Sequence, residues 1–124
     1  MLFITHDLEL AGAVCDRTCV MYAGQIVETR AAEKLHGDPL HPYSAALVEA
    51  RPNILSTADR LVAIPGRPVS AFESPSGCRF APRCPHAEDS CRSHEQVVTD
   101  LDGGQVRCER ATALRRNLLD GAHA

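Results

Sequence analysis

Four cysteines in the second half of the chain are the residues best suited to carry chemistry. They are separated by five, six and sixteen residues, and they are Cys78, Cys84, Cys91 and Cys108. Zinc sites usually take pairs of thiolates about two to four residues apart, and none of these gaps fits that spacing. Wider spacing in loops can still supply four thiolates to an iron–sulfur cluster. The residues alone leave three interpretations open: an iron–sulfur cluster, a zinc or other metal site, and free thiols or oxidised pairs.

The composition restricts the setting of these cysteines. The 124 residues carry a net charge of −3 with neutral histidines and one lysine, Lys34, so the charge gives no reason to expect nucleic-acid binding. No apolar run approaches the roughly 20 residues that span a bilayer, and the first residues do not resemble a signal peptide. We therefore expect a cytoplasmic chain, where clustered cysteines are metal ligands or redox groups more often than disulfides. The remaining pair, Cys15 and Cys19, is expected to be buried.

The start of the chain is predicted to be a strand that leads into a helix. Residues 2–4 form an apolar run typical of a strand buried in a parallel sheet. Asp7 is well placed to cap a helix over residues 8–15, with Glu9 in its first turn. His6 then lies at the corner between strand and helix, where an imidazole can reach a bound polyanion.

The rest of the chain is predicted to contain one hairpin, three helices and an irregular segment. Ala23-Gly24 is a turn signal between two β-rich runs, and several prolines and glycines interrupt the middle of the chain. The predicted elements are strands over residues 18–22 and 25–29, helices over 30–36, 42–51 and 110–120, and an irregular segment over 65–85.

Several segments resemble a known family. Residues 3–8, Phe-Ile-Thr-His-Asp-Leu, resemble the switch-histidine segment of ABC ATPases, and residues 20–28 resemble the hairpin that follows it. Residues 38–47 contain His-Pro-Tyr, which resembles the signature of the peptide-transporter subfamily. Residues 64–68 and 76–87 are similar, in order, to the C-terminal extension of that subfamily. By these motifs the chain is identified as a member of the family of ATP-binding subunits of bacterial oligopeptide/dipeptide ABC transporters.

The resemblance implies an α/β fold in two parts. It implies the C-terminal piece of an ABC ATPase nucleotide-binding domain, with a strand, a helix, a β-hairpin and further helices, followed by a loop-rich accessory domain that contains cysteines. The implied division is residues 1–37 for the ATPase remnant with the switch histidine, 38–110 for the transporter extension with the cysteine cluster, and 111–124 for a terminal helix or tail.

The resemblance also implies a role in energy coupling. His6 would contact the γ-phosphate of ATP bound with Mg²⁺, in a subunit that pairs with a second ATP-binding subunit and with membrane permease subunits on the inner face of the plasma membrane. A Gly-x-x-x-x-Gly-Lys-[Ser/Thr] loop, a glutamine loop, a signature motif and a Walker B strand do not occur in these 124 residues. We therefore expect the chain to be a fragment that is not an ATPase alone, whether a truncated gene product or an excised domain.

For the four cysteines, the resemblance implies a 4Fe-4S cluster, with zinc as the alternative. The sequence departs from the family pattern near Cys108, which Glu109 and Arg110 follow, so His86 or His94 is a candidate substitute for the fourth ligand. Two other functions stay open: a small iron–sulfur or zinc-binding interaction or regulatory module, and a remnant that never folds. Four arginines near the cysteines in sequence are candidates to balance the charge of a cluster: Arg79, Arg83, Arg92 and Arg107.

Overall fold

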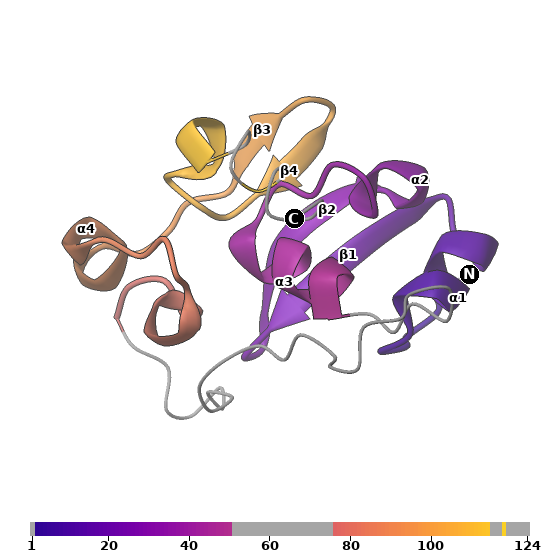
Figure 1. Ribbon diagram of the computed structural model, residues 1–124, viewed down its shortest axis with the longest axis horizontal. Coiled ribbons are helices and arrows are strands. Elements are labelled where there is room, and N and C mark those ends of the chain that lie inside the picture. Colours follow the sequence, from indigo (N-terminus) through magenta and orange to yellow (C-terminus); the bar gives the residue numbers. More distant parts are fainter. Residues whose placement is uncertain (1, 51–75, 115–117, 119–124) are drawn as a thin grey trace, which may run out of the picture.

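The computed structural model describes residues 2–50, 76–114 and 118. In these residues helices and strands are mixed along the chain, and Figure 1 shows them around one sheet. The elements are α1 (Leu8–Val14), β1 (Arg17–Tyr22), β2 (Gln25–Ala31), α2 (Ala32–Leu35), α3 (Pro42–Ala50), the 3₁₀ turn η2 (Ala81–Arg83), α4 (Asp89–Ser93), β3 (Thr99–Leu101) and β4 (Gly104–Val106).

The sheet has four antiparallel strands in the order β1-β2-β4-β3. The first hairpin turns at Ala23 and Gly24, both with positive φ, as the sequence predicted. The second hairpin was not predicted, although Asp102-Gly103 at its turn is a strong hairpin signal and both residues again have positive φ. Because β2 pairs with β4, the sheet joins the start of the chain to the segment between Cys91 and Cys108 (Figure 1).

The predicted strand over residues 2–4 is wrong. These residues have no regular structure, and Leu2 and Ile4 are each 86% exposed. A buried strand of a parallel sheet requires hydrogen-bonded neighbours, and within the described residues the sheet is antiparallel and ends at β1 and β3. Within the part of the chain that the structure describes, this apolar run therefore has no paired strand.

The three helix predictions near the start have different outcomes. The helix after Asp7 is confirmed as α1, and the Asp7 side chain accepts a hydrogen bond from the backbone N–H of Leu10 at 3.1 Å. The helix begun by Pro42 is confirmed as α3. The helix predicted over residues 30–36 is shorter, because Arg30 and Ala31 still pair with β1 and α2 begins only at residue 32.

An aromatic cluster joins the cysteine segment to the first hairpin. Phe80 is buried between Tyr22 of β1 and Tyr43 of α3, with ring centroids 5.2 and 5.3 Å from them. The two tyrosine rings lie 4.7 Å apart. Val20, Val27 and Leu35 complete this core. Since each ring removes a large apolar area from water, Phe80 anchors the loop that carries Cys78 and Cys84.

Two charged side chains on β2 are buried in the fold. The carboxylate of Glu28, 1% exposed, accepts hydrogen bonds from the backbone N–H groups of Leu40 at 3.0 Å and His41 at 2.8 Å. Arg30, also 1% exposed, donates to the carboxylates of Asp38 at 2.5 Å and Asp102 at 2.9 Å. Together they tie the segment between α2 and α3 to the sheet and to the turn of the second hairpin.

The remaining expectations concern the middle and the end of the chain. The stop at Pro52 and the family-like segment 64–68 lie outside the described residues. Near the end, residues 111–114 are helical, and Ala111, Leu114 and Leu118 are buried as the predicted face requires. In the part of the chain that the structure describes, no helix is long and apolar enough to cross a membrane.

The Glu28 contacts predict a large difference between two substitutions. Glu28→Ala leaves two buried backbone N–H groups without an acceptor, so we expect a loss of about 2–5 kcal/mol in the free energy of unfolding. Glu28→Gln keeps one acceptor oxygen, and we expect a loss of about 1 kcal/mol. Urea unfolding followed by circular dichroism measures both, with the exposed Glu33→Ala as the matched control. Equal losses in the two Glu28 variants would contradict this role.

The pH dependence provides an independent check of the same residue. Burial raises the pKa of Glu28 above its ordinary value of 4.5, although the hydrogen bonds that it accepts act in the opposite direction. The folded chain therefore holds this proton more tightly than the unfolded chain. The resulting stability is present below about pH 4.5 and is lost as the pH rises through the raised pKa. Glu28→Gln cannot titrate, so its stability profile should lack this fall.

Candidate functional site

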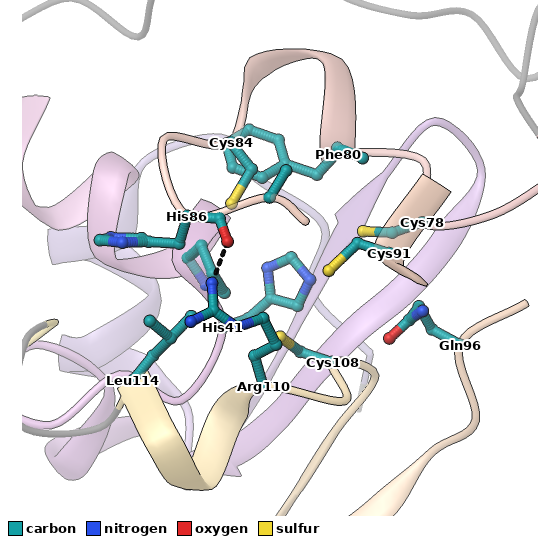
Figure 2. A pocket seen from close by; sticks show the side chains of 13 residues that line it. His41, Cys78, Phe80, Cys84, His86, Cys91, Gln96, Cys108, Arg110 and Leu114 are labelled. Carbon is teal, nitrogen blue, oxygen red and sulfur yellow. Dashed lines mark hydrogen bonds between the residues drawn. The ribbon is translucent and has the colours of Figure 1, made fainter. Parts of the chain in front are cut away.

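The four cysteines of the second half line one pocket. Cys78, Cys84, Cys91 and Cys108 share it with His41 and Arg110, and Figure 2 shows all four sulfur atoms pointing into it. The cavity is narrow, with a volume of about 10 Å³. Within the described residues, no three side chains of the His, Cys, Asp and Glu types are grouped so as to hold a metal ion.

Three of these cysteines are held by the segment between residues 76 and 93. Cys84 follows the 3₁₀ turn η2, where its N–H donates to the carbonyl of Ala81, and Cys91 lies in α4. The N–H of Cys78 donates to the carbonyl of Cys91 at 2.7 Å. This contact needs the glycine before it, because a Cβ on Gly77 would lie 2.4 Å from the Cys91 carbonyl oxygen.

The fourth cysteine is positioned by the sheet. Cys108 lies two residues after β4, and the preceding Arg107 donates its N–H to the carbonyl of Val27 at 2.8 Å. The side-chain oxygen of Gln96 accepts from the N–H of Glu109 at 2.7 Å. The register of β4 on β2 therefore decides where Cys108 meets the other three cysteines.

The thiols lie in a poorly solvated environment. Burial raises the pKa of Cys78 and Cys84 above the ordinary thiol value, and it raises the pKa of Cys108 to about 12. For Cys108 the neighbouring thiols act in the same direction, while a backbone hydrogen bond at Arg110 acts against it. Binding of a metal to these residues must therefore displace protons.

A histidine that the sequence did not single out as a site residue lies in the pocket. The His41 side chain is 1% exposed, and Figure 2 shows its ring pointing into the pocket. Burial lowers its pKa to about 3, so the ring is neutral. The sequence signal that could have found His41 is its position directly before Pro42, the first residue of a predicted helix. In the structure the backbone N–H of His41 donates to Glu28.

The two histidines proposed as substitutes for the fourth ligand are placed differently. Figure 2 shows the His86 ring pointing away from the four sulfur atoms. His94 is exposed, its Nδ1 lies 3.3 Å from the Ser90 carbonyl oxygen, and it is not among the residues that line the pocket. All four predicted cysteines line the pocket. His86 also lines it but turns its ring away from the sulfur atoms, and His94 lies outside it.

The cation that lines the pocket is Arg110, which donates to the His86 carbonyl and pairs with Glu88 at 3.3 Å. The arginines selected from sequence proximity are not among the residues that line it. Arg79 donates to the Ala23 carbonyl, Arg83 to the Tyr22 hydroxyl, Arg92 pairs with Asp89, and Arg107 donates to the Ile26 carbonyl.

His6 lies apart from the cysteine pocket. Its side chain is exposed directly before α1, without the strand that was predicted to precede it, and it is not among the pocket residues. The backbone there is held by Thr5, whose hydroxyl oxygen accepts the N–H of Asp7 at 3.0 Å. The expectation that Cys15 and Cys19 are buried is wrong, because Cys19 is exposed and Cys15 is half-buried. Cys19 lies on the outer face of the edge strand β1.

Comparisons with known proteins point to one family. The family model described as "Oligopeptide/dipeptide transporter, C-terminal region" matches residues 27–91. The dipeptide transport ATP-binding protein DppD of Escherichia coli is 41% identical over 109 residues, which are 87% of this chain and 33% of that protein. The oligopeptide transport ATP-binding protein AppD of Bacillus subtilis is 43% identical over 109 residues, with the same coverage. The chain thus spans about a third of the length of the curated relatives it matches.

The close approach at Gly77 predicts that alanine is not tolerated there. Gly77→Ala must separate residue 77 from the carbonyls of Cys91 and Arg92, so we expect a loss of about 1–3 kcal/mol and faster alkylation of the Cys78 thiol. Thermal melting and iodoacetamide labelling, read by mass spectrometry, measure the two effects. Gly37→Ala is the matched control, because nothing lies within 4 Å of its added Cβ. Similar behaviour of both variants would contradict the close packing.

Proposed function

The chain belongs to the family of the oligopeptide/dipeptide transporter C-terminal region, and on this premise we propose that it forms part of the ATP-binding, energy-coupling subunit of a peptide importer. In the assembled importer, ATP closes a pair of such subunits and hydrolysis reopens them. This cycle drives membrane permease subunits, so the subunit lies peripherally on the inner face of the plasma membrane.

One observation carries this proposal. The family match covers residues 27–91, which include the His-Pro-Tyr segment and three of the four pocket cysteines. The relatives that share 41–43% of aligned residues are named as transport ATP-binding proteins for dipeptides and oligopeptides. Because the chain spans about a third of those relatives, it is proposed to supply only part of the subunit.

The proposed division assigns residues 1–37 to the ATPase domain, 38–110 to the transporter extension and 111–124 to a tail. The pairing of β2 with β4 means that the first two regions share one sheet. We therefore propose that the extension packs against the end of the ATPase domain and is continuous with it. The cysteine pocket then lies on the side of the extension that is remote from α1.

His6 is the proposed catalytic contribution of this chain. An exposed imidazole at the start of α1 is free to approach the γ-phosphate of an ATP–Mg²⁺ complex held by other segments of the subunit. The hydrogen bonds made by the Thr5 and Asp7 side chains support this role, because they restrain the backbone on both sides of His6. The chain itself has no glycine-rich phosphate loop, so we propose that it does not retain nucleotide alone.

The His6 proposal predicts a loss of turnover without a loss of binding. In the complete subunit that carries this sequence, His6→Ala should lower ATP hydrolysis about 10²-fold or more, because the imidazole positions the reacting groups. ATP affinity should change little, since other segments hold the phosphates. His94→Ala, an exposed histidine outside the pocket, is the control. Saturable micromolar ATP binding with turnover by the 124-residue chain alone would overturn the proposal.

For the pocket, we propose that Cys78, Cys84, Cys91 and Cys108 hold a 4Fe-4S cluster. The donor chemistry supports this proposal, because three thiols from residues 76–93 and the thiol of Cys108 point into one pocket, with Arg110 beside them to offset negative charge. Within the described residues the thiols are not yet grouped closely enough to hold a metal ion, so binding requires them to move. Because the cavity has a volume of only about 10 Å³, the surrounding side chains must move apart to admit the cluster. When bound, the cluster cross-links a segment that has little regular structure of its own.

Reconstitution tests the pocket assignment. With ferrous iron and sulfide under anaerobic conditions, the chain should gain broad absorption near roughly 400 nm. Serine at any one of the four pocket cysteines should remove most of the bound iron, whereas Cys15→Ser and Cys19→Ser should retain it. A colourless protein that binds one zinc per chain would replace the cluster with the zinc alternative.

A second candidate function is a small cluster- or zinc-binding module that acts in interaction or regulation. The same four-thiol pocket favours it, because the pocket forms from this chain alone. The two candidates differ in their dependence on His6. A module predicts that His6→Ala leaves the activity of the assembled importer unchanged, while loss of a pocket cysteine impairs it.

A further inference from the structure

The tautomer of His41 follows from its hydrogen bonds. Nδ1 of the ring accepts the backbone N–H of Tyr43 at 2.9 Å. A nitrogen that accepts a hydrogen bond carries no proton, so the single ring proton of the neutral imidazole is on Nε2. The backbone of His41 is fixed as well, since its own N–H donates to Glu28 at 2.8 Å. The ring therefore presents an N–H donor in a determined direction.

This donor is buried and has no partner. Nε2 is inaccessible to solvent, and within the described residues no group forms a hydrogen bond with it. The backbone carbonyl of Arg107 favours the protonated ring, but it does not reach hydrogen-bond geometry with Nε2. Buried donors are almost always paired, so an unpaired one that points into a pocket calls for a ligand with an acceptor atom.

The pocket around this donor contains sulfur. His41 and the four cysteines line the same cavity, and Figure 2 shows the His41 ring and the four sulfur atoms directed into it. Thiolates and the sulfides of an iron–sulfur cluster accept hydrogen bonds, and such bonds help to set the reduction potential of a cluster. A ring with its proton on Nε2 cannot at the same time offer that nitrogen as a metal ligand.

We propose that His41 donates a hydrogen bond from Nε2–H to a sulfur atom of the cluster held by Cys78, Cys84, Cys91 and Cys108, and thereby raises its reduction potential; this inference rests on the proposed cluster. The direction follows from charge, because addition of an electron makes the cluster more negative and the N–H dipole stabilises the more negative state. His41 is a positioning residue, while the four cysteines remain the ligands.

A pair of substitutions separates this hydrogen bond from packing. Asparagine at position 41 keeps a short acceptor near the N–H of Tyr43 but has no atom at the Nε2 position. Glutamine is longer and places an amide N–H near that position. His94→Asn is the control, since His94 is exposed and outside the pocket. All four proteins are reconstituted anaerobically, and their iron content is measured before comparison.

The readouts are the midpoint potential and the magnetic coupling to exchangeable protons. In dithionite titrations followed by electron paramagnetic resonance, His41→Asn should shift the midpoint downward, while His41→Gln and His94→Asn should stay near wild type. Exchange into D₂O should reveal a coupled proton in wild type and His41→Gln that is lost in His41→Asn. An unchanged midpoint and an unchanged proton coupling in His41→Asn would overturn the hydrogen bond and leave the cluster itself in place.

A measurement on the unmodified chain keeps the test decisive if the variants do not load with iron. Wild type labelled with ¹⁵N-histidine should show a weak nitrogen coupling to the reduced cluster, transmitted through the hydrogen bond. Absence of this coupling in a loaded cluster would overturn the proposal. A strong coupling typical of direct ligation would also overturn it, by making His41 a ligand. Failure of wild type to bind iron would instead overturn the cluster assignment, and this inference with it.

Discussion

The arrangement of the pocket depends on the hydrogen bonds that the buried carboxylate of Glu28 accepts. It is held on β2, and it binds the N–H groups of Leu40 and His41, which lie immediately before α3. A buried charge is costly unless it is hydrogen-bonded, so the segment before α3 has few other positions in which Glu28 would keep its partners. Arg30, two residues along the same strand, restrains the segment through Asp38 and the second hairpin through Asp102. The orientation of the His41 ring is a consequence of these polar contacts.

The cysteine segment is coupled to the sheet by apolar packing. Phe80 inserts between Tyr22 and Tyr43, and it carries Cys78 and Cys84 on either side in sequence. Cys108 approaches from the opposite direction, at the end of β4. The pocket therefore exists only where the aromatic cluster and the second hairpin meet. A ligand bound by all four thiols would stabilise the contact between these two parts of the chain, which are far apart in sequence.

Local signals were reliable wherever one or two residues decide the backbone. Asp7 capped a helix, Ala23-Gly24 formed a hairpin turn and Pro42 began a helix, as predicted, because each acts through its own hydrogen bonds or φ angle. Predictions that depend on neighbours failed. Residues 2–4 have the composition of a buried strand, but within the described residues no strand lies beside them. Arg30 was expected in a helix and is in β2, because pairing with Thr18 and the ion pairs of its buried guanidinium with Asp38 and Asp102 favour the extended backbone.

By itself, the sequence determined the family, the four cysteines that line the pocket and the helix that begins after Asp7. These depend on residue identity and order, which are read directly from the chain. The tertiary structure decided that Arg110 rather than the nearer arginines lines the pocket and that the His41 ring points into it. It also decided that the His86 ring points away from the sulfur atoms and that His94 lies outside the pocket. The physical reason is that these placements result from the register of β4 on β2 and from the buried Glu28 contact. Both bring together residues that the linear order keeps apart.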